Sequence, residues 1–253
     1  MRKFLLATTA LLALSGAIAP AKADLVLSDL VFRDLGGTGF GAAPRLLTLH
    51  DNVFESGATV AGAGGTTILT GGAISGADKS LVYNVGALGW TSGANVGIGL
   101  NTSEIGATTG LTFNTLVLTL YNSAGVSIGS FSGNGPVFID QALLAEQAGN
   151  GNSVFDIRLD ATEQAEYNTI LANNGGAANI FEGLSASFGC VTPAVGCGPS
   201  SDGQESFLAF NAGIAPPVPE ASTWVMMLLG FVSVGLLGMR RSGGSTPFRM
   251  FSA

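Results

Sequence analysis

The stretch LTFNTLVLTLYNSAGVSIGSF, residues 111–131, decides the fold class. Its first arm carries leucines at alternate positions, Leu116, Leu118 and Leu120. This spacing places all three side chains on one face of a β-strand. The letters YNSAG supply turn residues, and the pattern resumes at Val126 and Ile128. We therefore expect a β-hairpin whose second arm turns Val126 and Ile128 back toward the same core.

The beginning of the first arm is out of phase with the rest of it. Leu111 and Phe113 stand at odd positions, whereas the leucines from Leu116 onward stand at even ones. An extra residue in one strand of an antiparallel pair restores the phase. The sequence therefore predicts a β-bulge near Asn114 or Thr115.

Three further segments alternate with period two between clusters of Gly, Asn and Ser. SLVYNV (80–85) aligns Leu81, Tyr83 and Val85. NVGIGL (95–100) aligns Val96, Ile98 and Leu100, with glycines opposite. VFDIRLD (154–160) aligns Phe155, Ile157 and Leu159 against charged residues. Each pattern is typical of a half-buried strand.

Helical signals are few. In DATEQAEYNTILANNGG (160–176), Asp160 and Glu163 have the spacing of a capping box, and Asn173 to Gly176 end the segment. DQALLAEQAG (140–149) favours a second, shorter helix. Many short strands with one or two short helices predict a mainly β domain, an antiparallel β-sandwich of jelly-roll-like arrangement.

The charge of the chain is unevenly distributed. All seventeen acidic residues lie within 24–220, and only four basic residues accompany them, so this part carries a formal charge of −13 against −7 for the whole chain. Nucleic-acid phosphates would repel such a surface, so we expect no nucleic-acid partner. The charge suits a solvated surface, and Ca²⁺ among acidic loops is the alternative.

Cys190 and Cys197 are the only cysteines. The spacing is wrong for a CxxC redox pair, and partner ligands for zinc are lacking. In an exported chain the two should form a disulfide that closes a short loop.

Both ends of the chain carry targeting patterns. Residues 1–23 combine a basic start, an apolar run and the letters AKA, the layout of a secretory signal peptide cut before Asp24. Residues 24–212 then form the extracytoplasmic domain, and 213–220 a Pro-rich linker. Residues 221–239 contain no charged residue, and at about 1.5 Å each they extend about 28 Å, close to the apolar thickness of a bilayer.

The tail 240–253 begins with two arginines, which orient a membrane helix with its preceding domain outside the cytoplasm. We therefore expect a precursor that is tethered to the inner membrane by a transmembrane helix. A Pro-Glu pair, a nearby Trp, an apolar segment with a Met-Met-Leu-Leu-Gly core and terminal arginines stand together at this end. These residues are Pro219, Glu220, Trp224, Met226, Met227, Leu228, Leu229, Gly230, Phe231, Arg240 and Arg241.

This combination resembles the PEP-CTERM sorting signal of Gram-negative bacteria. The sequence departs from the pattern in having Ala221 where a second Pro is expected, and in the extension 242–253 after the arginines. The resemblance implies recognition by a membrane enzyme, exosortase, that removes the helix and sends the body to the cell surface or matrix. It also implies an association with exopolysaccharide and biofilm formation.

Candidates for chemistry are sparse. His50 is the only histidine, and no G-x-S-x-G elbow accompanies it, so a hydrolytic site there is the weakest hypothesis. Trp90, with Tyr83 nearby in sequence, could stack on a sugar ring if its indole were exposed, whereas an indole that fills the core is the interpretation we favour. Aspartates that could line a Ca²⁺ site lack the D-x-D-x-D-G pattern; they are Asp24, Asp29, Asp34, Asp78 and Asp202.

Three functions follow from these patterns. The first is a non-enzymatic, exported surface or extracellular-matrix protein without a cofactor. The second is a carbohydrate-binding module that uses Trp90 and the surrounding loop. The third is a hydrolase around His50.

Overall fold

The computed structural model describes residues 32–34, 43–51, 53–103, 110–133, 135–147, 153–190, 197–200 and 203–214, together with Phe231. The predicted signal peptide and, except for Phe231, the predicted transmembrane segment lie outside the described residues. Among the residues that are described, no helix has the length and apolar character needed to cross a membrane.

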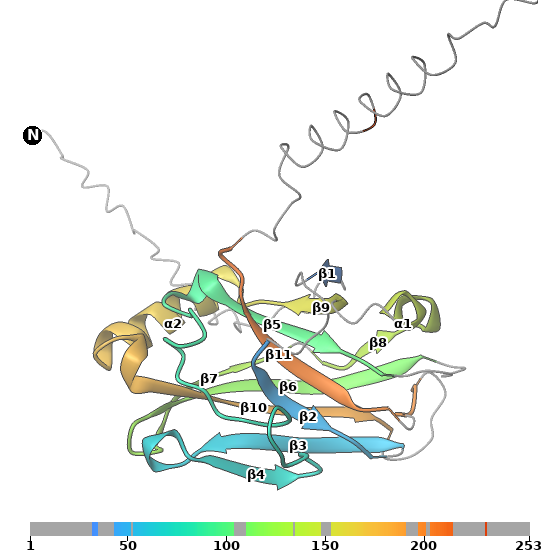
Figure 1. Cartoon of the computed structure of the whole chain (residues 1–253), viewed down its shortest axis with the longest axis horizontal. Coiled ribbons are helices and arrows are strands. Elements are labelled where there is room, and N and C mark those ends of the chain that lie inside the picture. Colours follow the sequence, from blue (N-terminus) through green and yellow to red (C-terminus); the bar gives the residue numbers. More distant parts are fainter. Residues whose placement is uncertain are drawn as a thin grey trace, which may run out of the picture.

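Two antiparallel sheets make up the described body (Figure 1). The five-stranded sheet has the order β1 (Phe32–Asp34), β9 (Ser153–Ile157), β5 (Val96–Asn101), β11 (Glu205–Asn211) and β2 (Arg45–Leu49). The six-stranded sheet has the order β4 (Thr67–Gly71), β3 (Phe54–Ala61), β10 (Ile180–Gly189), β6 (Leu111–Asn122) and β7 (Ser127–Ser132), and β8 (Val137–Ile139) pairs with the start of β6. The prediction of a mainly β, antiparallel domain is confirmed.

The two sheets share one core. Phe113 on β6 and Phe188 on β10 belong to the six-stranded sheet, and their ring centroids lie 4.9 Å apart. Phe207 on β11 of the other sheet lies 5.7 Å from Phe188 by the same measure. Apolar side chains from both sheets are buried around this trio, so each sheet hides the inner face of the other.

The predicted hairpin is β6 and β7. At its turn, the Asn122 side chain accepts hydrogen bonds from the backbone N–H groups of Ala124 and Val126, at 3.0 Å each. Gly125 follows with φ of +77°, a value that glycine adopts readily. The three leucines of the first arm are buried as expected.

The predicted bulge is confirmed. Ser187 of β10 pairs with Thr115, and the next residue, Phe188, pairs with Phe113, so Asn114 is the extra residue. Its side chain donates a hydrogen bond of 2.8 Å to the Gly189 carbonyl instead of joining the ladder.

The prediction that Val126 of the second arm faces the core is wrong. This side chain is 58% exposed because it precedes β7 and lies in the turn, and the buried residue of the arm is Phe131. A register shift after Leu120 pairs Tyr121 with Ser127 and leaves Ile128 as the extra residue, half-buried against the core. The turn and this bulge change the phase of the second arm.

The prediction of a strand at 80–85 is wrong. Only Asn84 forms a bridge, to Phe181 of β10. Two backbone bonds still hold the segment beside β10, from Val85 N–H to the Ile180 carbonyl (3.0 Å) and from Glu182 N–H to the Tyr83 carbonyl (3.0 Å). The Tyr83 N–H instead donates to the Glu182 side chain at 2.9 Å, so a side chain takes the place of a ladder partner.

The other two predicted strands are confirmed as β5 and β9. On β5 the alternate glycines have no room for a side chain, since a Cβ on Gly97 would meet the ring of Phe210 and one on Gly99 would meet Val154. On β9 the polar positions face outward, and Arg158 beyond its end forms an ion pair with Asp156 at 2.7 Å.

Both predicted helices are present, as α1 (Gln141–Gln147) and α2 (Ala161–Asn173). The capping box of α2 is complete: the Asp160 side chain accepts from Glu163 N–H at 2.7 Å, and the Glu163 side chain accepts from Asp160 N–H at 3.1 Å. The buried face of α2, which includes Tyr167 and Ile170, lies against the core beside β7.

Candidate functional site

The predicted sorting residues from Pro219 to Arg241 lie outside the described residues, apart from Phe231. The sites that can be built from the described part are the disulfide corner, the buried cluster around Trp90, and the surfaces of the two sheets.

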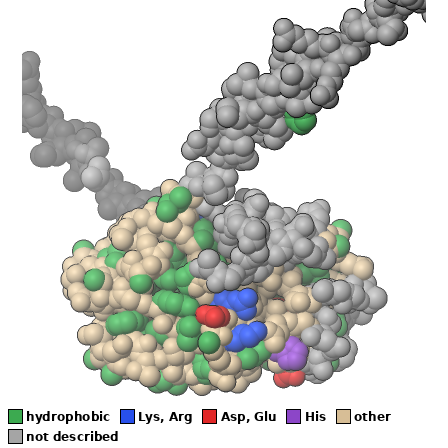
Figure 2. All heavy atoms as spheres, viewed as in Figure 1, with side chains coloured by type: hydrophobic (Ala, Val, Ile, Leu, Met, Phe, Trp, Pro, Cys, Tyr) green, Lys and Arg blue, Asp and Glu red, His purple; other side chains and the backbone are tan. Residues whose placement is uncertain are grey.

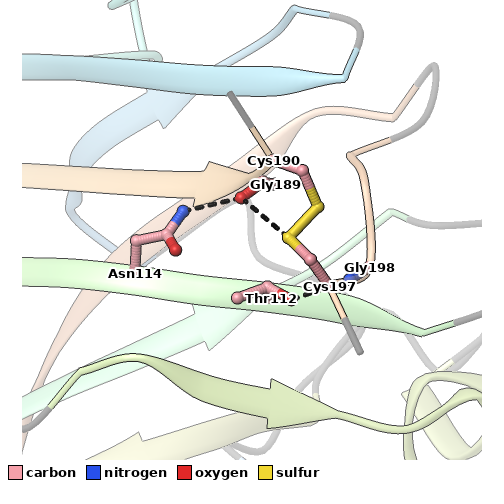
Figure 3. Close-up of a disulfide and its surroundings, with 6 residues drawn as sticks. All are labelled: Thr112, Asn114, Gly189, Cys190, Cys197 and Gly198. Atoms are coloured by element: carbon pink, nitrogen blue, oxygen red, sulfur yellow. Dashed lines mark hydrogen bonds between the residues drawn. A yellow bond between two sulfur atoms is a disulfide. The ribbon is translucent and has the colours of Figure 1, made fainter. Parts of the chain in front are cut away.

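The disulfide corner lies at the end of β10 in the six-stranded sheet (Figure 3). Cys190 follows the end of β10, and Cys197 belongs to the segment that leads into β11 on the other sheet. Their Cα atoms lie 6.1 Å apart, which confirms the predicted pairing. The disulfide therefore closes a loop at the point where the chain crosses from one sheet to the other.

Hydrogen bonds fix the segment after Cys197 to the bulged end of β6 (Figure 3). Gly198 N–H donates to the Thr112 hydroxyl at 2.8 Å, and Thr112 N–H donates to the Gly198 carbonyl at 3.0 Å. The corner has a structural role, because its polar groups are engaged with one another and with backbone.

A buried carboxyl group supports the same corner from β3. Glu55 is 1% exposed, and its Oε1 accepts from the Ser200 hydroxyl at 2.8 Å and from Asp51 N–H at 2.9 Å. Between them Val53 adopts φ of +78°, unusual for a β-branched residue, while its backbone bonds to Ser200 and Cys190. These bonds hold the β2–β3 connection against the disulfide segment.

Trp90 is fully buried, as in the interpretation that we favoured from the sequence, and the alternative of an exposed indole that stacks on a sugar is wrong. The indole N–H donates to the Phe210 carbonyl at 2.8 Å, and the Trp90 carbonyl accepts from the Tyr167 hydroxyl at 2.9 Å. Both polar ends of the residue are satisfied inside the protein, which lets the ring fill the core at low cost. Tyr83, the other residue proposed to contact a ligand, is half-buried.

Glu182 lies in the same interior. It shares the inner face of β10 with Ile180, Leu184, Ala186 and Phe188. Burial raises the pKa of Glu182 to about 8, although the hydrogen bond from Tyr83 N–H acts in the opposite direction. The carboxyl group is therefore mostly protonated at neutral pH.

Burial also raises the pKa of Tyr167, and the nearby Glu182 adds to the effect. Both groups are neutral at neutral pH and closed off from solvent. This cluster can stabilise the fold, but it offers no reacting atom to a substrate.

His50 is exposed and directly follows the end of β2. Of the aspartates considered for Ca²⁺, Asp24, Asp29 and Asp202 lie outside the described residues, and only the backbone of Asp34 is described. Asp78 is exposed, and among the described residues no group of His, Cys, Asp and Glu could hold a metal ion.

Charged side chains are few on the surface that can be seen. Figure 2 shows one face of the molecule on which basic and acidic groups lie close together, while uncharged atoms cover most of the rest of the described surface. Lys79 donates a hydrogen bond of 2.9 Å to the Gln204 side chain.

Sequence reasoning missed the buried glutamates. Glu182 is in phase with the apolar residues of β10, so the alternation in IFEGLSASF contains the signal that its side chain turns inward. Glu55 gives no such signal, because its partners Ser200 and Asp51 come from other parts of the chain.

We found no protein-family model, no curated protein and no solved structure that matches this chain.

Proposed function

We propose that this chain is a non-enzymatic, exported surface or extracellular-matrix protein with a structural or adhesive role. Its acidic body is delivered by the signal peptide 1–23 and sorted through the C-terminal segment by an exosortase-like membrane enzyme. The inner membrane holds the precursor, and the processed body reaches the cell surface or the surrounding matrix, where exopolysaccharide is its expected neighbour.

The Cys190–Cys197 disulfide is the observation that carries this proposal. Disulfides persist in oxidising compartments and are rare in the cytoplasm. A disulfide at the crossing between the sheets therefore favours a body that folds after export. The buried Trp90 and the closed cluster around Glu182 agree with a non-enzymatic role, because they place these groups in the core.

We also infer a jelly-roll arrangement for the body. One sheet contains β2, β11, β5 and β9 in this order, and the other contains β3, β10, β6 and β7. Along the chain the connections pass repeatedly from one sheet to the other, as in a double Greek key. Such a sandwich supports many functions, so the function rests on targeting and surface chemistry rather than on the fold.

Mass spectrometry of the protein from its host tests the proposal. We expect an N-terminus at Asp24 and a C-terminus close to Glu220 in the culture supernatant or surface fraction. A matched Glu220→Ala variant should accumulate in the membrane fraction with its C-terminal segment intact. A wild-type protein that keeps both Met1 and Ala253 would contradict the proposal.

A further inference from the structure

The outer face of the six-stranded sheet is unusual in its chemistry. Its five main strands contain two charged residues, Glu55 and Glu182, and both are buried on the inner side. Side chains alternate between the two faces of a strand, so every outward position of these described strands is uncharged. In a body with a formal charge of −13 this is a distinct surface.

Hydroxyl groups cover much of this face. The strand register brings Ser and Thr residues into rows across neighbouring strands, interrupted by Gly and Val. The rows are Gly183, Thr119 and Ser130; Ser185, Val117 and Ser132; and Ser56, Ser187 and Thr115. The hydroxyls of Thr115 and Ser187 lie 2.7 Å apart and bond to each other.

Two aromatic residues stand next to each other at one side of this face. Phe181 on β10 pairs directly with Tyr121 on β6. Directly opposed residues in an antiparallel pair have Cβ atoms about 5 Å apart, so the two aromatic side chains start from neighbouring points on this face. Both residues remain half-exposed.

The Tyr121 ring of β6 lies beside Gly183 of the neighbouring strand β10. A Cβ built on Gly183 would come within 2.9 Å of the ring edge, and Gly183 is buried although its position points outward. Burial raises the pKa of the Tyr121 hydroxyl, and a hydrogen bond with Thr119, two residues back on the same face, acts in the opposite direction. Contact with Gly183 thus fixes one edge of the ring against the sheet, while the residue remains partly exposed.

The Phe181 ring is fixed in a similar way. It lies against Gly65 of the short turn after β3, where a Cβ would overlap the ring. Two rings that are already positioned lose little conformational freedom when a ligand binds.

We propose that this outer face, centred on Tyr121 and Phe181, binds an uncharged polysaccharide. The C–H face of a sugar ring packs on the exposed side of a flat aromatic ring, while its hydroxyl groups find partners in the Ser and Thr rows. The absence of charge from the outward positions of these strands suits a neutral ligand and gives an anionic one no counter-charge. The inference deepens the proposed function, since export would bring this face into contact with surface glycans.

Affinity electrophoresis of the purified full-length protein tests this site. The gels contain dextran, galactomannan or xyloglucan, which are uncharged, or alginate, which is anionic. We expect retardation by at least one uncharged polysaccharide and none by alginate. Tyr121→Ala and Phe181→Ala should each weaken the binding about tenfold, as expected for the loss of one stacking contact.

Two further variants test whether loss of the aromatic ring itself causes the weaker binding. Tyr121→Phe keeps the ring and should bind within about threefold of the wild type. Val126→Ala removes an exposed apolar side chain in the turn beyond the face and should bind like the wild type. Circular dichroism checks that each variant is folded.

The proposal is overturned if no uncharged polysaccharide retards the protein, or if Tyr121→Ala binds as the wild type does. It is also overturned if the protein forms dimers that Tyr121→Ala abolishes, since a second copy would then occupy the face. None of these results depends on C-terminal processing, so they are distinguishable from a failure of the sorting proposal.

Discussion

The inner and outer faces of the six-stranded sheet differ in where the charged residues lie, and the charges are on the buried side. The inner face buries Glu55 and Glu182 among large apolar side chains, whereas the outer face carries Ser, Thr and Gly together with aliphatic and aromatic side chains, and no charge. Solvent-facing positions usually hold the charges of a sheet. The difference indicates that the inner face determines stability, while the composition of the outer face reflects what it contacts.

The sharpest test of this comparison uses two phenylalanines on one strand. Phe188 of β10 is fully buried between Phe113 and Phe207, whereas Phe181 is half-exposed on the other face. Phe188→Ala should lower the free energy of unfolding by about 3–5 kcal/mol, because it leaves a cavity in the core. Phe181→Ala should cost about 1 kcal/mol or less.

Urea unfolding followed by circular dichroism measures both values. Equal losses for the two variants would mean that the faces do not have separate roles.

The protonation of Glu182 provides the next test. Its folded pKa of about 8 exceeds its unfolded value of about 4.3, so the folded state binds more protons between these two values. The stability associated with the neutral carboxyl group is fully present below about pH 4 and is lost as the pH rises through about 8.

Glu182→Gln keeps the shape and the acceptor for Tyr83 N–H but cannot ionise. We expect the wild type to lose on the order of 3 kcal/mol between pH 5 and pH 9 relative to this variant. The measurement is the free energy of urea unfolding at several pH values. Parallel pH profiles for the two proteins would contradict the burial of an ionisable group on the inner face.

The disulfide corner should contribute a smaller amount. Replacing both Cys190 and Cys197 with Ser opens a short loop, for which the chain-entropy model gives a loss of about 2.5 kcal/mol. Thermal unfolding of the variant and of the wild type, with and without a reducing agent, measures this loss. A reducing agent that does not lower the melting temperature of the wild type would show that the bond is not formed or does not stabilise the fold.

A charge placed on the outer face should affect stability least. Ser185 is half-exposed beside Val117, so Ser185→Lys should change the free energy of unfolding by about 0.5 kcal/mol or less. The same variant should bind an uncharged polysaccharide less well, because the long side chain covers the hydroxyl rows. Unfolding caused by Ser185→Lys would show that this face is covered by another part of the molecule.

Local patterns in the sequence predicted much of the fold. The phase break between Phe113 and Leu116 predicted a bulge near Asn114 or Thr115, and the structure has it at Asn114. The spacing of Asp160 and Glu163 predicted the start of α2. Both signals are local, since the groups that produce them are neighbours in sequence.

The sequence could not predict features that depend on long-range partners. The segment 80–85 has the alternation of a strand, but the Glu182 side chain binds the Tyr83 N–H that a ladder would use. The pairing of Phe181 with Tyr121 depends on the register between β10 and β6, which the sequence of either strand alone does not specify. The sequence favoured a core position for Trp90 over an exposed one. Its hydrogen bonds to Phe210 and from Tyr167, which the sequence does not reveal, explain why its polar groups can be buried there.

Two adjacent residues of β6 test the central comparison most directly. Leu120 points into the core and Tyr121 points outward, so their alanine variants should fail in different ways. Unfolding free energy and retardation by an uncharged polysaccharide are measured on both. We expect Leu120→Ala to lose about 2–5 kcal/mol of stability while its folded fraction binds normally, and Tyr121→Ala to lose about tenfold in binding with about 1 kcal/mol of stability. The account is contradicted if Leu120→Ala weakens binding by the folded protein as much as Tyr121→Ala does.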